Sequence, residues 1–218
     1  MAGMKKIFLA SNSPRRKALF GLFGWPFEVL PAEIDESQLP GEPPAVFVKR
    51  LACQKAQKVS REEGNGLVIG ADTIVVDGSE ILGKPASADE AVRMLRQLRG
   101  RTHQVYTGIA IIGSHTGQAF NVVSQTDVTM RNYSDDEIRA YVATGDPLDK
   151  AGAYAIQHEG FHPVAALDGC FASVMGLPLC LLSQGLLEFG MKPPADLQER
   201  CQEALNFTCP ILTEMGKV

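Results

Sequence analysis

The stretch IFLASNSPRRKALFGLF, residues 7–23, decides the fold class, because it passes from a buried strand into a helix within a few residues. Residues 7–10 form a short apolar run that is typical of a buried strand. Pro14 follows the serines and the asparagine of residues 11–13, and proline directly after a serine cap is a common helix start. The pattern predicts a strand that leads straight into a helix over residues 14–23.

Strands and helices continue to alternate along the rest of the chain. Helices are predicted at residues 44–63, 87–98, 134–144 and 177–189, with a further short helix after residue 191. Strands are predicted at residues 27–30, 67–76, 81–82, 104–112, 119–130, 164–167 and 172–174, with one more short strand inside the glycine-rich loop 145–160. The alternation favours an α/β fold. The two long strands joined by a hairpin at residues 113–117 predict a mixed, rather than a purely parallel, sheet.

Charge and cysteine content limit the possible partners. The 218 residues carry a formal net charge of -4, so the mean charge does not attract nucleic acid or anionic membrane, and a phosphate ligand needs a local cluster of cations. The five cysteines form no C-x-x-C pair, which argues against a disulfide framework or a structural zinc site and favours a reducing compartment. The apolar runs are shorter than a signal peptide or a membrane span of ~18 residues requires, so a cytoplasmic location is expected.

The segment SNSPRRK, residues 11–17, has the composition of a phosphate site. A helix N-terminus offers free N–H groups and positive potential, to which Ser11 and Ser13 add hydroxyl donors. Arg15 and Arg16 add planar guanidinium groups that match phosphate oxygens. The alternative is a well-capped helix with solvated arginines. Cations in the first helical turn oppose the helix dipole, which favours the phosphate site.

The segment GADT, residues 70–73, interrupts a strongly apolar strand. Burial of the Asp72 carboxylate is costly unless the group is paired or bound to a metal, so Asp72 is the best candidate for a catalytic or metal-binding acid. The alternative is an aspartate in a turn at the strand end. Asp35 and Glu36 lie in an acidic loop and, with Asp72, could form a magnesium or manganese site, although each alone is typical of surface charge.

Two segments imitate known motifs and are rejected. GSEILGKP, residues 78–85, nearly matches a P-loop, but the final proline has neither a hydroxyl for magnesium nor an N–H for phosphate. A rigid Lys84 could still contact a phosphate. HEGFH, residues 158–162, matches the zinc-protease pattern, but the glycine inside it and the proline after it disfavour the helix that such a site needs.

The segment DKAGAYAIQ, residues 149–157, combines polar groups with small residues. Small residues let a ligand approach the backbone, Lys150 could face the same cleft, and the Gln157 amide could read a base edge. The alternative is an ordinary structured loop.

Together these motifs resemble the Maf family of nucleoside triphosphate pyrophosphatases. The segments that carry the resemblance follow in family order: ASNSPRR (10–16), RLACQKA (50–56), GADTIV (70–75), ILGKP (81–85), HQVYTG (103–108), PLDKAGAYAIQ (147–157) and VMGLP (174–178). The resemblance runs from residue 7 to about residue 189. It therefore predicts a pyrophosphatase domain over residues 1–190 and a C-terminal extension over residues 191–218.

The resemblance implies a mixed twisted sheet with flanking helices and two lobes around a nucleotide cleft, as in inosine triphosphate pyrophosphatases. It implies cleavage between the α and β phosphates with a divalent cation, Mg²⁺ or Mn²⁺, and a homodimer. The family has a dTTP/UTP branch and a 7-methyl-GTP branch. Arg15, Thr73 and Gln157 match the dTTP/UTP branch and are expected to set specificity.

The roles carried over by the resemblance are as follows. Asp72 is the expected proton acceptor or metal-linked base, with Asp35 as a second metal ligand and Glu36 as a further candidate. The triphosphate-binding residues are expected to be Ser11, Arg15, Arg16, Lys55, Lys84 and Lys150. Two rival functions stay open. One is a non-catalytic nucleotide-binding regulator of cell division and septum formation, and the other is house-cleaning hydrolysis of modified nucleotides.

Overall fold

The structure is a computed structural model that describes residues 5–209. Its strands are β1 (Ile7–Leu9), β2 (Glu28–Val29), β3 (Leu67–Asp77), β4 (Glu80–Leu82), β5 (Thr102–Gly113), β6 (Ala119–Met130) and β7 (Val164–Asp168). Within the described residues they form one sheet in the order β2-β1-β3-β5-β6-β7, with β4 paired to β3. β1 pairs in parallel with β2 and β3, whereas the remaining pairs are antiparallel, which confirms the predicted mixed sheet.

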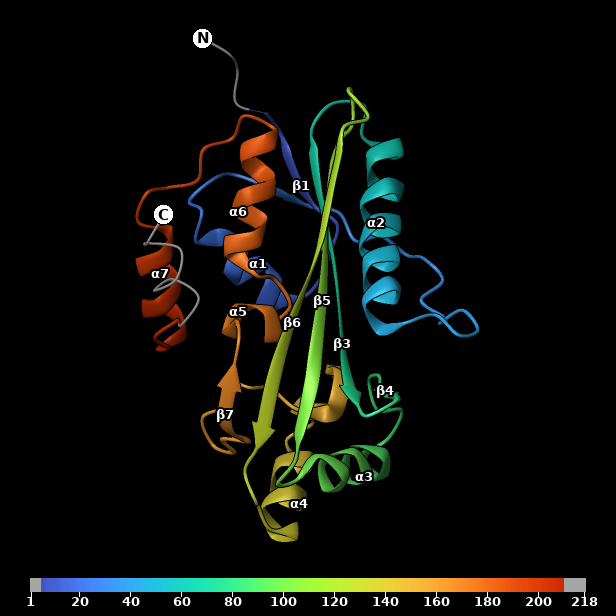
Figure 1. Ribbon diagram of the computed structural model, residues 1–218, viewed down its shortest axis with the longest axis vertical. Helices are drawn as coiled ribbons and strands as arrows, with labels where there is room; N and C mark the ends of the chain where they lie inside the picture. The colour runs from blue at the N-terminus through green and yellow to red at the C-terminus, as the bar shows by residue number, and fades with distance from the viewer. Residues whose placement is uncertain (1–4, 210–218) are drawn as a thin grey trace.

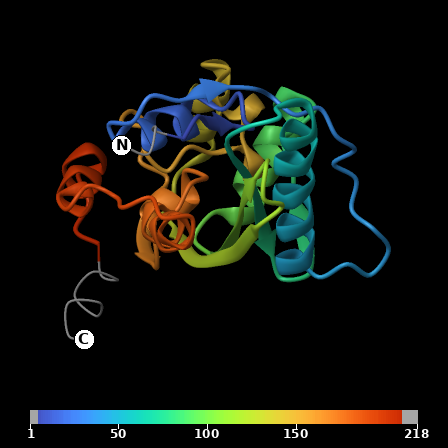
Figure 2. The ribbon, with the colours of Figure 1, turned by 90° about the horizontal axis from the view of Figure 1, so that it is seen from above.

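Helices cover both faces of this sheet. They are α1 (Pro14–Gly21), α2 (Pro44–Glu62), α3 (Ala88–Leu98), α4 (Asp135–Ala143), α5 (Phe171–Val174), α6 (Leu179–Glu188) and α7 (Leu197–Leu205), with 3₁₀ helices η1 (Asp146–Asp149) and η2 (Ala151–Ala153). Figure 1 shows α2 on one side of the long strands and α1 and α6 on the other. Figure 2, seen from above, shows the same layers, with α7 outside α6. None of the helices within residues 5–209 has the length and apolar character that a membrane crossing requires.

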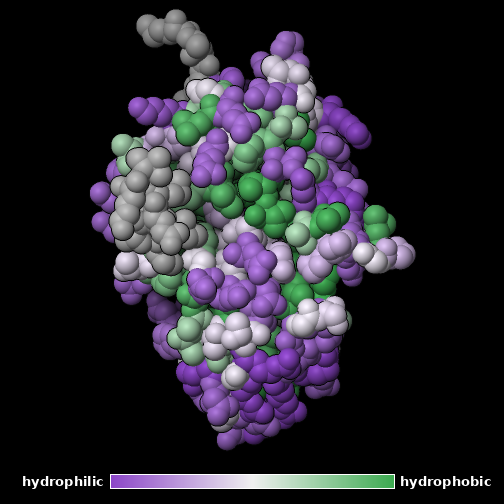
Figure 3. Space-filling view, in the orientation of Figure 1, coloured by the Kyte–Doolittle hydropathy of each residue, from purple (hydrophilic) through white to green (hydrophobic). Residues whose placement is uncertain are grey.

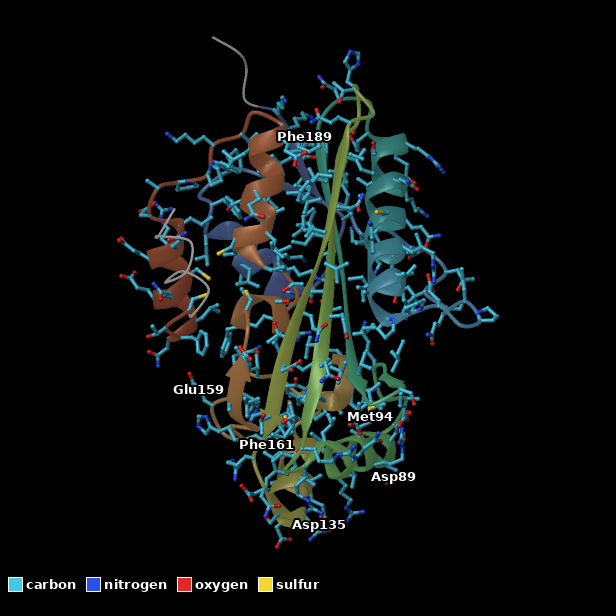
Figure 4. The ribbon with its side chains drawn as sticks, viewed as in Figure 1. Asp89, Met94, Asp135, Glu159, Phe161 and Phe189 are labelled. Atoms are coloured by element: carbon cyan, nitrogen blue, oxygen red, sulfur yellow. The ribbon has the colours of Figure 1, made fainter. Side chains whose placement is uncertain are left out.

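The long strands β3, β5 and β6 pass through two lobes with separate large buried clusters, and two smaller clusters lie under α2. Figure 4 labels Phe189 at one end of the molecule, in the core under α1 and α6, and Met94 and Phe161 at the other end, in the core beside α3 and α4. The surface over α3 and α4 is mostly hydrophilic (Figure 3). The mixed sheet predicted from the strand pattern and the two lobes implied by the resemblance are therefore both present.

Two glycines let α2 lie close against the sheet. A Cβ on Gly70 would collide with the carbonyl oxygen of Ala52, and a Cβ on Gly108 would lie 2.5 Å from that of Val48. Any larger residue would push the helix away from β3 and β5. The close approach matters for the site, because α2 also carries Lys55.

Three local predictions from the sequence are wrong. The strand at residues 67–76 is not interrupted, because β3 is continuous and the Asp72 carboxylate is paired. Residues 172–174 belong to helix α5 and not to a strand, since short apolar runs do not distinguish the two. The loop 145–160 contains η1 and η2 instead of a strand, and Gly152 breaks any extended run with a φ of 68°.

Candidate active site

A cleft of about 740 Å³ opens along one edge of β3. On that edge β1 pairs with residues 67–69 and β4 pairs with residues 75–77. No described strand pairs with residues 70–74 there, so the segment that contains Asp72 borders the cleft. The α1 N-terminus, the loop before α2, α2 itself, the β4–α3 connection and residues 149–157 complete its walls. Segments that are far apart in the sequence thus lie together around residues 70–74 of β3, which have no described strand partner on this edge. We call this stretch the gap along β3.

Three charged groups meet on the α2 side of β3. The Lys55 Nζ atom lies 2.6 Å from Asp72 Oδ1 and 2.6 Å from Glu36 Oε1. The Lys55 and Asp72 side chains are buried, whereas that of Glu36 is 54% exposed. Burial raises the pKa of Glu36, but Lys55, with Lys84 and Arg16, lowers this pKa further, so it stays below its ordinary value. Glu36 and Asp72 therefore present two carboxylates around one cation.

Arg16 lies on the opposite side of β3 and is held by three hydrogen bonds. Its Nε donates to the Gly176 carbonyl at 2.9 Å, its Nη1 to Ser11 Oγ at 3.2 Å and its Nη2 to Thr73 Oγ1 at 3.2 Å. Burial lowers the pKa of Arg16, although Asp72 and Glu36 oppose this shift. The guanidinium plane is thus fixed at the cleft by groups from three separate segments.

A chain of hydroxyl groups continues from Arg16 into the protein. The Thr107 hydroxyl donates to the Ser173 carbonyl at 2.8 Å, so its oxygen accepts the hydrogen bond that joins it to Thr73 at 2.9 Å. The Thr73 hydroxyl then donates to Thr107 and accepts from Arg16. Its single hydrogen is directed away from the cleft, which makes Thr73 a support for Arg16.

The third group of charges lies at η1 and η2. The Lys150 Nζ donates to the Asp146 carbonyl at 2.6 Å, to Asp146 Oδ1 at 2.9 Å and to Asp149 Oδ1 at 2.6 Å. Asp149 Oδ2 also lies 3.9 Å from Arg15 Nη1, and Tyr141 donates to Asp146 at 2.6 Å. Lys150 is buried at the cleft wall with its charge matched by two carboxylates.

Most of the residues singled out in the sequence line this cleft. They are Ser11, Arg15, Arg16, Lys55, Asp72, Thr73, Lys84, Lys150 and Gln157. Asp35, the expected second metal ligand, is not brought to the described cleft lining. Its exposed carboxylate accepts from the Ser37 amide at 2.9 Å, and the neighbouring Glu36 reaches the cleft instead.

Sequence reasoning missed the residues that support the site. Thr107 and Asp149 had no assigned role, because their importance lies in contacts with Thr73 and Arg15 that are distant in the chain. The available signal was their place in the family segments HQVYTG (103–108) and PLDKAGAYAIQ (147–157). The structure also agrees with the rejection of the two imitated motifs. Residues 158–162 lie in turns and lack the helix that a zinc-protease site needs. Residues 78–85 run through β4 into irregular structure, with no helix such as follows a P-loop.

The two carboxylates of the cleft, Glu36 and Asp72, fit a hard divalent cation whose remaining ligands come from water and a bound phosphate. Within residues 5–209 no group of three or more His, Cys, Asp or Glu side chains could hold a metal by itself. Glu36 and Asp72 nonetheless converge on the Lys55 ammonium, which occupies a position suited to positive charge. Mg²⁺ is usually bound by one or two carboxylates together with waters and substrate phosphates.

Comparison with known proteins identifies close relatives. A family model described as "Maf-like protein" matches residues 6–189. A dTTP/UTP pyrophosphatase of Moorella thermoacetica is 47% identical over 188 residues, which cover 86% of this chain and 97% of the relative. Proteins with the same description from Pelotomaculum thermopropionicum (44% identical over 187 residues, 86% of this chain and 98% of the relative) and Bacillus cereus strain AH820 (45% over 188 residues, 86% and 97%) are also similar.

Proposed function

The chain belongs to the Maf family, and we propose that it hydrolyses dTTP and UTP to the nucleoside monophosphate and pyrophosphate. The observation that carries this proposal is the composition of the cleft. Arg15, Arg16, Lys55 and Lys84 line it together with the Asp72 carboxylate, although the whole chain is acidic. A local excess of cations around a buried acid is what a triphosphate and its hydrolysis require.

In the proposed mechanism Asp72 accepts the proton of the water that attacks the α-phosphate. The Lys55 ammonium, whose Nζ lies 2.6 Å from Asp72 Oδ1, pairs with this carboxylate and orients it. Arg15, Arg16 and Lys84 bind the phosphate oxygens, with Ser11 beside Arg16. These cations neutralise the charge of the triphosphate and of the departing pyrophosphate.

Glu36 and Asp72 are the residues that would hold Mg²⁺ or Mn²⁺, and Glu36 replaces Asp35 in this proposal. A divalent cation bound there supplies acidification of water and neutralisation of phosphate charge. Lys55, which lines the same cleft, would contact a phosphate oxygen of the bound nucleotide.

Base selection is proposed to depend on Gln157 and, less directly, on Thr73. Gln157 is exposed at the cleft, where its amide can hydrogen-bond a pyrimidine edge. Thr73 would act on the substrate through Arg16, because its hydroxyl hydrogen is donated to Thr107. Arg15, paired with Asp149, would contact the nucleotide from the neighbouring wall.

The test is pyrophosphate release from a nucleotide panel with Mg²⁺, with Mn²⁺ and with chelator. The proposal expects metal-dependent turnover of dTTP and UTP well above that of 7-methyl-GTP. Binding of dTTP without any pyrophosphate release would instead indicate the regulator of cell division. Preference for modified pyrimidine triphosphates over dTTP would indicate the house-cleaning role.

We also propose that the protein is a cytoplasmic homodimer. The free thiols of the five cysteines favour a reducing compartment. Analytical ultracentrifugation checks the dimer.

We further propose that the pyrophosphatase domain ends near residue 190. The family match ends at residue 189, which supports this boundary. Helix α7 of the extension packs through Leu197 on the core that lies under α1 and α6. Residues 210–218 lie outside the described part of the chain.

A further inference from the structure

Residues 31–43 form an irregular loop between β2 and α2 that delivers Glu36 to the cleft. The Glu36 side chain is 54% exposed, and its contact with Lys55 is an ion pair at the cleft surface. One ion pair whose Glu36 partner is mostly in solvent fixes the loop at a single point only. Before Glu36 the loop is held by Lys58 Nζ, which donates to the Glu33 carbonyl at 3.0 Å, and by Ala32 and Ile34, which pack on the core. The part of the loop after Glu36 needs an attachment of its own if the Glu36 carboxylate is to stay beside Lys55.

Arg50 of α2 provides that attachment. Its Nε lies 2.7 Å from Glu42 Oε1 and its Nη2 lies 2.7 Å from Glu42 Oε2, which is a two-bond pair between a planar guanidinium and a carboxylate. The Glu42 side chain is only 5% exposed. The same Nη2 donates to the Ser37 carbonyl at 3.0 Å, one residue after Glu36.

Glu42 also accepts hydrogen bonds from residues 38 and 39 of the same loop, which close a turn. Its Oε2 accepts from the Leu39 amide at 3.2 Å, and its backbone carbonyl accepts from Gln38 Nε2 at 2.8 Å. Arg50 thus binds a folded turn rather than a single side chain. Since Ser37 belongs to the same unit, the backbone next to Glu36 is fixed as well.

We propose that Arg50 is a positioning residue, which fastens this loop to α2 and so holds the Glu36 carboxylate beside Lys55 and Asp72. Arg50 is absent from the described residues that line the cleft, so it acts through the loop. Lys55 and Lys58 lie on the same helix, so the polar attachments of the loop share one rigid support. The effect on turnover rests on the proposed function, whereas the effect on loop order does not.

The loop is tested directly by hydrogen exchange. Arg50→Lys keeps the charge but loses the two-bond geometry, and amides of residues 37–42 should exchange at least about tenfold faster, with the α2 amides unchanged. Arg61→Lys, an exposed arginine in the last turn of α2, is the matched control and should leave the loop amides unchanged. Unchanged exchange in Arg50→Lys overturns the proposal.

The action through Glu36 is tested by combining variants. Arg50→Lys should lower kcat/KM for dTTP by about tenfold in the wild-type background, but by less than about twofold when Glu36 is already Gln. Losses that multiply in the double variant overturn the proposal. If Arg50→Lys does not fold, Glu42→Gln replaces it with the same expectations. A wild-type protein without turnover refutes the proposed function, while the exchange result still decides the role of Arg50.

Discussion

Asp72 and Thr73 are neighbours on β3, yet the two faces of the strand at these residues have opposite characters. On the α2 side Asp72 lies against the Lys55 ammonium, with Glu36 completing a cluster of three charges. On the other side Thr73 joins Arg16 to a chain of neutral hydroxyl and carbonyl groups. Successive side chains of a strand point to opposite faces, so one continuous strand can supply a reacting group and a support for substrate binding.

The largest expected effect on activity comes from the α2 side of β3, which we call the charged face because Asp72, Lys55 and Glu36 meet there. Asp72→Asn removes the proton acceptor and should lower kcat for pyrophosphate release from dTTP by about a thousandfold. Circular dichroism should show an intact fold, because asparagine keeps the shape of the side chain. Asp77→Asn, which changes another buried carboxylate of β3 outside the cleft lining, should stay within about threefold of wild type. Near-normal turnover of Asp72→Asn would show that the proton acceptor lies elsewhere.

Glu36→Gln tests whether the charged face needs both carboxylates. The variant should lower kcat/KM for dTTP by about a hundredfold and weaken Mn²⁺ binding measured by calorimetry, because one of two anionic donors is lost. Asp35→Asn is the matched control, since this exposed carboxylate is held at the Ser37 amide and should affect activity less than about twofold. The reverse ranking of the two variants would restore the sequence-based assignment of Asp35.

The side of β3 that carries Thr73 and Arg16 should be sensitive to acid. His103 is fully buried beside Tyr154, and burial lowers its pKa from 6.5 to about 4 although Asp77 and Asp127 oppose this shift. Between these values the unfolded chain binds more protons than the folded one, so stability falls as the pH falls.

The expected loss from His103 is about 2 kcal/mol of unfolding free energy between pH 7 and pH 5. Urea titrations at the two pH values measure it. In His103→Phe the pH dependence should shrink by that amount, whereas His115→Gln, a change at an exposed loop histidine, should leave it unaltered. Equal pH dependence in wild type and His103→Phe would refute the burial of a neutral imidazole.

The smallest effect is expected from the hydroxyl chain. Thr107→Val removes the acceptor of Thr73 and should destabilise the fold by about 1 kcal/mol while raising KM for dTTP by about fivefold, since Arg16 loses its support. Thr102→Val, on the same strand at an exposed hydroxyl pair, should leave KM unaltered. A change in kcat alone would mean that Thr107 acts on the charged face instead.

Much of the fold followed from patterns within short segments. Pro14 and Pro44 begin the helices predicted there, and β6 has the predicted bounds. Errors arose where a long-range contact overrides the local pattern. The run around Asp72 looks like an interrupted strand only if the Lys55 ammonium, which pairs its carboxylate, is unknown.

For the candidate site, too, some residues could be identified from the sequence and others only from the folded structure. Arg16, Lys55 and Asp72 were identified from residue type and motif, and all three line the cleft. The choice between Asp35 and Glu36 could not be made from the sequence, because adjacent loop residues have the same chemistry. It depends on which carboxylate the folded loop directs at Lys55.

The sequence by itself determined the alternation of elements, the family and the set of charged residues, because these are properties of residue type and spacing. The tertiary structure alone decided the partners of those charges. The gap along β3, the approach of α2 over Gly70 and Gly108, and the clamp of Arg50 on Glu42 each join segments that lie apart in the chain. Electrostatic and hydrogen-bond energies depend on distances between atoms, and only the packed chain fixes those distances.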